Sequence, residues 1–457
     1  MIENCTWREF VAPPALTCEM EGVSTPGNER QLGFWKCLAL VVGNIVGAGV
    51  FLLPASIAPF GANNLWGWAV AIGGSLCLAV VLAALARRMT GGPYAYVSSA
   101  FGAEVGFLVM WSYWISVWTA NATLSIAVVS YASSLVPALG VNPAPPFIAV
   151  GCLFLFTLIN TRGAAAAGSV QVVTTALKLL PLIAVCLVAL SVALGGGKSA
   201  PQAPVPVAAG GIASVAALAM FAMLGFECAT LPTGKVFNEK RNVPLATVLG
   251  TLGAGLMTLA ACSAVLFLLP FYVAAKSPAP FADAIAPALG HSAGTLIALF
   301  ALVSALGALN GWVLCSGEVP LAMSRAGVFP EWFGKTSGAG TPVRSQWFST
   351  IVASALVWAN YSGSMTEAFT FIVLVSTVAA LVLYGAAALA ALKMRVTSAA
   401  ALAGVGFTVF AFWGAGLEAS LWGFGLLFTG LPVWWLNRRS RAGSIRAAAA
   451  IPGAPLE

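Results

Sequence analysis

Long apolar stretches separated by short polar segments fill the chain from about residue 35 to residue 437. A helix needs roughly 20 mainly apolar residues to cross a lipid bilayer. The pattern therefore predicts about twelve transmembrane helices, over residues 35–59, 64–86, 105–136, 146–161, 168–196, 211–235, 244–271, 289–317, 343–361, 366–392, 399–417 and 419–437. No long polar stretch interrupts the series, so we expect one all-α polytopic membrane domain.

The composition excludes other broad classes of protein. Of the 457 residues, 60% are hydrophobic and 8% are charged, whereas a soluble domain is about 45–50% apolar and about 25% charged. Disordered chains are polar and rich in charge, so disorder is excluded as well. The chain has one histidine, His291, and its nine cysteines form no CxxC motif. We therefore expect neither a metal site nor a cofactor.

Polar segments flank the apolar region at both ends. Residues 1–33 carry five glutamates and lack the basic-then-apolar pattern of a signal peptide. Residues 439–457 form a short basic tail that is rich in alanine. We expect an N-terminal cytoplasmic tail (1–33), a membrane domain (34–438) and a C-terminal cytoplasmic tail (439–457). Met20 is an alternative start, which N-terminal sequencing would decide.

The lysines and arginines support this orientation. With both termini inside, the cytoplasmic segments hold 18 of the 21 basic residues, and the outer segments hold Lys198 and Lys276. This asymmetry is what the positive-inside rule requires. The net charge of +7 therefore needs no nucleic-acid partner. The remaining basic residue, Lys178, lies within a predicted span.

Two predicted spans carry interruptions. The first contains Gly43, Gly47 and Gly49, and each glycine weakens a helix by up to about 1 kcal/mol relative to alanine. The sixth contains Gly225 followed by Glu227, and an ionisable group inside a membrane is usually functional. Close helix packing through small residues is the alternative interpretation of the glycines. Interrupted spans five apart are typical of an inverted repeat of five plus five helices, here with two further helices at the C-terminus.

Four motifs resemble the amino acid–polyamine–organocation (APC) superfamily of transporters: residues 43–54 (GNIVGAGVFLLP), 91–96 (GGPYAY), 225–227 (GFE) and 238–244 (NEKRNVP). Within its basic amino acid/polyamine antiporter group, the chain is most similar to the bacterial arginine/agmatine antiporters, over essentially everything after residue 32. The resemblance implies a LeuT-like fold with broken helices 1 and 6, and a substrate site between spans 1, 3, 6, 8 and 10. It also implies the bacterial inner membrane and a homodimer.

The resemblance also assigns roles to individual residues. It implies that Tyr113, Glu227 and Tyr384 form gates, and that the substrate contacts are Asn44, Ala48, Gly49, Asn121, Phe221, Trp312 and Ser376. The α-carboxylate of the substrate would meet backbone amides near Ala48 and Gly49. Taken alone, Trp312 and Tyr384 are equally typical of a membrane-protein core, and Asn121 of a hydrogen bond between helices.

Three positions depart from the arginine/agmatine group. Ala48 replaces a serine, which removes a hydroxyl contact to the substrate carboxylate, and Phe221 replaces a tryptophan, the better partner for a cation. Lys178 replaces a small apolar residue and is similar to a lysine of proton-coupled relatives. That similarity implies a proton-coupling role for Lys178, together with Glu227, since an apolar environment favours the neutral amine. The alternative is that Lys178 extends to the membrane interface.

The sequence therefore predicts a secondary active transporter that moves amino acids, and polyamines, across the bilayer by alternating access. It lacks the GxxxxGK[ST] motif of ATP use, and we expect no enzymatic activity. Exchange of a cationic amino acid for its amine, as in the arginine/agmatine type, is the first hypothesis. Proton-coupled symport of a wider range of amino acids is the second. A channel or membrane scaffold is the third, and the pair of interrupted spans argues against it.

Overall fold

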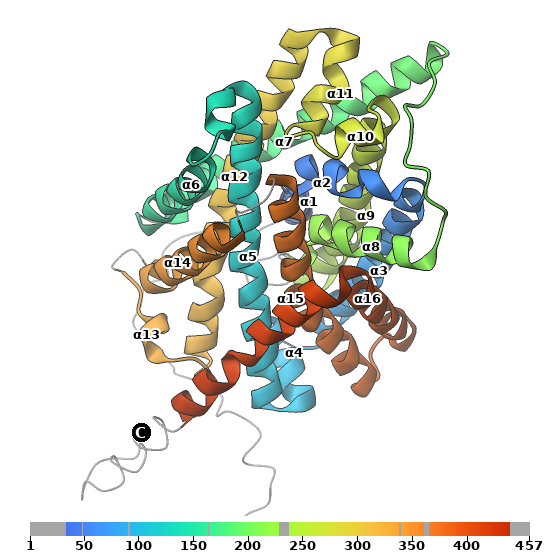
Figure 1. Ribbon diagram of the computed structural model, residues 1–457. Coiled ribbons are helices and arrows are strands. Elements are labelled where there is room, and N and C mark those ends of the chain that lie inside the picture. The colour runs from blue at the N-terminus through green and yellow to red at the C-terminus, as the bar shows by residue number, and fades with distance from the viewer. Residues whose placement is uncertain are drawn as a thin grey trace, which may run out of the picture.

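The computed structural model describes residues 33–47, 49–89, 92–162, 164–227, 237–337, 340–360 and 365–438, without the side chains of 36, 40, 164–176 and 239. These residues form helices and no strand (Figure 1). The α-helices are α1 (Phe34–Ile45), α2 (Gly49–Ile57), α3 (Asn63–Ala86), α4 (Gly92–Phe101), α5 (Ala103–Leu135), α6 (Ala144–Thr161), α7 (Ala164–Leu194), α8 (Ala209–Met223), α9 (Glu239–Leu268), α10 (Phe271–Ala274), α11 (Pro280–Leu289), α12 (His291–Arg325), α13 (Glu331–Gly334), α14 (Val343–Asn360), α15 (Met365–Lys393) and α16 (Ser398–Phe428). Two short 3₁₀ helices, Ala58–Phe60 and Pro137–Gly140, complete the described elements.

The structure is that of a polytopic membrane protein. Among the described residues, eight helices are long and apolar enough to cross a membrane, and the pair α1 and α2 is a ninth candidate, bent by 41° at its break. This number is below the expected twelve for three reasons. The last two predicted spans meet at a kink, where Gly416 has a non-helical φ of 81°, and the two helices are counted here as one element, α16. Helix α8 ends at Met223 after 15 residues, and residues 228–235 of the predicted span 211–235 lie outside the described residues. Helix α14 is long enough, but its polar residues make its mean hydropathy too low for a candidate span.

Helix α5 forms the centre of the bundle. It is the most completely buried of the candidate spans and packs against α12 and α15. Figure 1 shows α5 running through the length of the molecule, with α6 and α14 beside it. On another side α3 packs against α8 and α9, and α1 packs against α9. Residues from α5, α8, α12 and α15 can therefore meet in the interior.

Both predicted interruptions are present and lie against each other. Helix α1 ends at Ile45 and α2 begins at Gly49, while α8 ends at Met223 and residues 224–227 follow as a turn. Gly225 in that turn has a φ of +116°, which side chains larger than glycine rarely adopt. A Cβ atom at Gly225 would lie 2.9 Å from the Cβ of Asn44 and 3.0 Å from its carbonyl carbon. The close approach of the two broken helices thus requires glycine at this position.

Candidate substrate site

The break after α1 redirects backbone hydrogen bonds. The Val46 N–H still donates to the Val42 carbonyl over 2.8 Å, but the Gly47 N–H donates to the Ile45 carbonyl over 2.7 Å. In a continuous helix the Gly47 N–H would donate to Gly43, four residues back. The Gly43 carbonyl therefore loses its helical donor inside the membrane domain, where such a group needs another partner.

Lys178 of α7 supplies that partner. Its Nζ donates to the Gly43 carbonyl over 3.2 Å, and the side chain is 1% exposed. A side chain this buried does not extend to the membrane interface, which was the alternative interpretation of Lys178. The sequence singled out this lysine as an intramembrane charge, but it gave no signal for Gly43, because that carbonyl becomes available only where the helix breaks.

A small cavity lies between the two breaks. Five helices contribute to it, through Asn44, Ile45, Gly47, Gly49, Val50, Ala120, Leu124, Phe221, Ala222, Leu224 and Trp312. Its volume is about 20 Å³, roughly the space of one water molecule. Four of the predicted substrate contacts, on α1, α2, α8 and α12, therefore share one cavity. An amino acid can enter it only when the surrounding helices move apart.

The ring of Phe221 closes this cavity against α2. A Cβ atom at Gly49 would lie 2.5 Å from Cε1 of Phe221, so the ring packs directly on the glycine backbone. Trp312 from α12 lines the same cavity. Two aromatic side chains on separate helices thus border the space next to the first turn of α2.

Two other predicted substrate contacts, Asn121 and Ser376, are not among the described residues that line the cavity. Asn121 donates from Nδ2 to the Trp312 carbonyl over 3.3 Å, and its buried Oδ1 has no hydrogen-bond partner among the described residues. Ser376 donates from Oγ to the Ser116 carbonyl over 2.9 Å, which joins α15 to α5. Ala48 lies outside the described residues.

The three predicted gate residues form one hydrogen-bonded cluster. The Tyr113 hydroxyl donates to Oε1 of Glu227 over 2.7 Å, and the Tyr384 hydroxyl donates to Oε2 over 2.7 Å. The Gly225 N–H also donates to Oε2, over 3.1 Å, and the ring of Phe226 lies 4.7 Å from that of Tyr384. One buried carboxylate thus ties α5 and α15 to the turn after α8. The Gly225 amide is a contact that the sequence did not predict, because it depends on the turn conformation.

The described residues contain no group of side chains suited to bind a metal ion. No group of three or more histidine, cysteine, aspartate or glutamate side chains among them could hold a metal ion. The groups that the described site presents are backbone amides and carbonyls, aromatic rings, hydroxyls, two amide side chains, one amine and one carboxylate.

Comparison with known proteins adds a second line of evidence. The family described as "Amino acid permease" matches residues 32–438. The cadaverine/lysine antiporter of Escherichia coli (strain K12) is 32% identical over 335 residues, which are 72% of this chain and 74% of that protein. The putrescine transporter PotE of the same strain is 28% identical over 427 residues, 89% of this chain and 96% of its own length. A putative arginine/ornithine antiporter of Bacillus subtilis (strain 168) is 28% identical over 400 residues, 80% and 84% of the two chains.

Proposed function

The chain belongs to the amino acid permease family, and from this premise we propose that it exchanges a basic amino acid for an amine across the bacterial inner membrane. Membership makes it a multi-pass transporter of amino acids or polyamines and not an enzyme. The similar proteins are named as transporters of lysine and cadaverine, of putrescine, and of arginine and ornithine. We place arginine and agmatine first, because the sequence motifs are most similar to that group.

The observation that carries this proposal is the cavity between the two helix breaks. Gly49 and Val50 of the first turn of α2 line this space, and the positive dipole end at the start of a helix suits a carboxylate. Phe221 and Trp312 provide aromatic faces, which suit a cation. A molecule with a carboxylate at one end and a cationic side chain at the other matches both features.

We further propose that Glu227 and its two tyrosines form a gate. Their hydrogen bonds join three elements around one carboxylate, and the adjoining cavity is too small for an amino acid. Binding and release therefore require movement of these elements. Alternating access by separation of this cluster on one side of the cavity is consistent with both facts.

A binding screen tests the proposed substrate class. Purified protein is heated with arginine, agmatine, lysine, cadaverine, ornithine or putrescine, and with leucine as a neutral control. A ligand at 100 times its Kd stabilises the folded state by about 2.7 kcal/mol, so a true substrate should raise the unfolding temperature. We expect stabilisation by at least one basic amino acid and its amine, and none by leucine. Equal stabilisation by leucine would contradict a cationic substrate.

Proton-coupled symport is the second candidate function, and Lys178 is the observation that favours it. Its ammonium bonds to the Gly43 carbonyl at the first break, so loss of a proton there would change the contacts of α1 directly. Proteoliposomes without internal substrate separate the two functions. Symport predicts concentrative uptake driven by an inward proton gradient, whereas exchange predicts none.

A further inference from the structure

A proline lies inside α12, about two helical turns after the cavity residue Trp312. Pro320 is part of the continuous helix His291–Arg325. Proline has no backbone N–H, so it cannot donate to the carbonyl four residues earlier in the helix. The carbonyl of Ser316 therefore lacks its helical donor. Ser316 is 0% exposed, and a buried carbonyl inside a membrane domain needs another partner.

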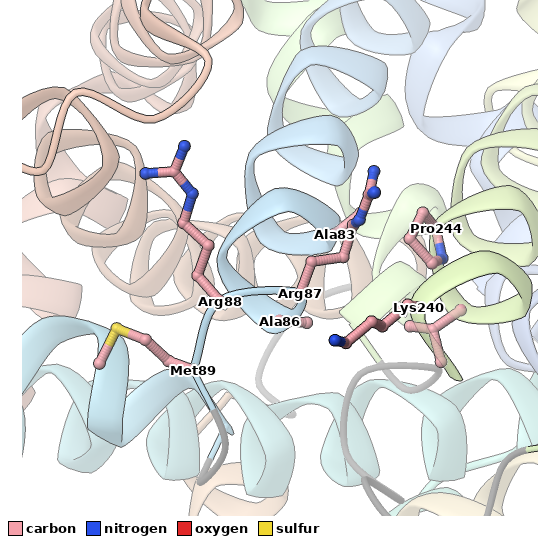
Figure 2. Close-up of a pocket in the computed structure, with 8 residues that line it drawn as sticks. Ala83, Ala86, Arg87, Arg88, Met89, Lys240 and Pro244 are labelled. Carbon is pink, nitrogen blue, oxygen red and sulfur yellow. The ribbon is translucent and has the colours of Figure 1, made fainter. Parts of the chain in front are cut away.

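Pro244 of α9 has the same effect in a different environment. It removes the helical donor of the Lys240 carbonyl, in the first turn of that helix. Both residues line a surface pocket of about 330 Å³ next to the end of α3, which carries Arg87 (Figure 2). Lys240 is exposed, so water can reach this end of α9. Ser316 is fully buried, and the donor to its carbonyl therefore has to come from the protein.

The side chains of Trp114 and Ser349 meet at the Ser316 carbonyl. Nε1 of Trp114, on α5, donates to it over 3.1 Å, and Oγ of Ser349, on α14, lies 3.1 Å from it. The Ser349 hydroxyl is also 2.9 Å from the Ser345 carbonyl, and it has a single hydrogen to donate. Trp114 is therefore the donor that the Ser316 carbonyl does not share with another carbonyl. Its side chain is 1% exposed.

This hydrogen bond lies one helical turn from the aromatic wall of the cavity. Trp312 precedes Ser316 by four residues, which is about 6 Å of helix. The Trp312 carbonyl accepts a hydrogen bond from Asn121, so α5 holds this part of α12 at two points. Tyr113, next to Trp114 on α5, donates to the carboxylate of the proposed gate. One stretch of α5 thus determines where the aromatic wall lies relative to the gate.

We propose that Trp114 is a positioning residue for substrate binding. Its N–H takes the place of the helical donor that Pro320 removes, and it holds the turn of α12 that carries Trp312 against α5. Trp114 is not among the described residues that line the cavity, so it acts through Trp312. This role rests on the proposed binding of a substrate cation at the Trp312 ring. Without the indole N–H the ring takes more than one position, and the affinity for a basic amino acid falls.

Fluorine NMR of the full-length protein tests the position of the Trp312 ring. The protein is labelled with 5-fluorotryptophan, and the resonance of Trp312 is assigned from its absence in Trp312→Phe. Trp114→Phe removes the N–H but keeps an aromatic ring next to Phe348, whose centroid lies 5.7 Å from that of Trp114. We expect the Trp312 resonance to split or broaden in this variant. The Kd of the basic amino acid that binds best should rise roughly three- to tenfold.

Pro320→Ala provides a rescue, because alanine returns a backbone N–H to the helix. That N–H can donate to the Ser316 carbonyl in place of the indole. Trp114→Phe combined with Pro320→Ala should therefore show a single Trp312 resonance, and a Kd within about twofold of that of Pro320→Ala alone. Trp68→Phe is the matched control. Trp68 is also 1% exposed, but its Nε1 has no hydrogen-bond partner among the described residues, so both readouts should stay unchanged.

Several results would overturn the positioning role. An unchanged Trp312 resonance in Trp114→Phe would show that the indole N–H does not hold the ring, and an unchanged Kd would remove the link to substrate binding. Changes that persist with Pro320→Ala would show that Trp114 does not act through the Ser316 carbonyl. Equal changes in Trp68→Phe would indicate a general packing effect. The resonance is measured without ligand, so a native protein that binds no basic amino acid would contradict the proposed function, while the spectra still decide what holds Trp312.

Discussion

At the scale of single residues, the carboxylate of Glu227 stabilises the closed site by accepting hydrogen bonds from two tyrosines. Hydrogen bonds to charged groups are worth about 1.5–3 kcal/mol each, and the hydroxyls of Tyr113 and Tyr384 donate one each. We predict that Tyr113→Phe and Tyr384→Phe each lower the rate of substrate exchange by roughly tenfold or more. Substrate affinity, measured by calorimetry, should change by less than about threefold, because neither tyrosine lines the cavity.

Tyr131→Phe is the matched control for these tyrosines. Its hydroxyl is also buried and hydrogen-bonded, but to the Phe51 carbonyl. It should lower thermal stability without the same change in rate. The double variant of Tyr113 and Tyr384 should be non-additive, because both act on one carboxylate. Additive effects, or losses of affinity that parallel the losses of rate, would show that the cluster is not a gate.

The ammonium of Lys178 gives a second prediction at the scale of one residue. Lys178→Met keeps an unbranched buried side chain but removes the donor to the Gly43 carbonyl. If Lys178 carries the coupled proton, uptake into proteoliposomes should lose its dependence on pH. Lys178→Arg should behave the same way, because arginine stays charged. Lys198→Met is the control, because Lys198 is exposed and lies on the predicted outer side, and this variant should retain the pH dependence of uptake. Unchanged pH dependence in Lys178→Met would exclude the proton role.

The aromatic wall of the cavity gives a third prediction. Phe221→Leu removes the π face while keeping an apolar side chain in the cavity. A cation–π contact is worth about 0.5–2 kcal/mol, so we expect the Kd of the basic substrate to rise roughly two- to thirtyfold. Phe226→Leu is the control, because the ring of Phe226 packs on Tyr384 and does not line the cavity. Equal losses in both variants would indicate a packing effect instead.

Sequence patterns identified individual side chains better than their partners. Lys178 and Glu227 stood out because an ionisable group in an apolar span is costly unless it has a role. The Gly43 carbonyl and the Gly225 amide could not be identified, because any backbone group becomes a partner only through the local conformation. The hydrogen bond from Ser376 to the Ser116 carbonyl could not be predicted either, since many hydroxyls in helices donate to a carbonyl of their own helix or of a neighbouring one.

Among the helices, the junction of the two breaks determines the geometry of the site. Gly225 combines a positive φ with contact to the backbone of Asn44. Gly225→Ala should therefore cost about 1–3 kcal/mol of stability and disrupt exchange, measured by thermal unfolding and transport. Gly253→Ala in α9 is the control, since a Cβ there meets no atom within 4 Å. A Gly225→Ala variant with native stability and activity would show that the breaks do not pack this way.

Hydropathy predicted the bounds of a helix well where one unbroken helix forms the whole span. Helices α3, α6 and α15 lie close to the predicted ranges. Length alone could not show that α8 ends at Met223, because the apolar residues continue into the turn. The kink at Gly416, whose φ of 81° is not helical, lies close to the predicted boundary between the last two spans. The inverted repeat remains a proposal that rests on the spacing of the two breaks.

The distribution of charge is a property of the whole molecule and predicts its orientation. The ends of the helices that carry most of the lysines and arginines, such as Arg87, Arg325 and Arg438, should face the cytoplasm, with both termini on that side. We expect a fluorescent protein fused after residue 457 to be fluorescent in cells, and alkaline phosphatase fused there to be inactive. The reverse result would invert the orientation.

The central claim is that the molecule exchanges a basic amino acid for an amine. Counterflow in proteoliposomes tests it most directly, with radiolabelled arginine outside and unlabelled agmatine inside, and lysine with cadaverine as a second pair. We predict saturable uptake of label that requires internal amine and is absent from empty vesicles. Equal uptake into empty vesicles, driven by a proton gradient or rising without saturation, would contradict exchange.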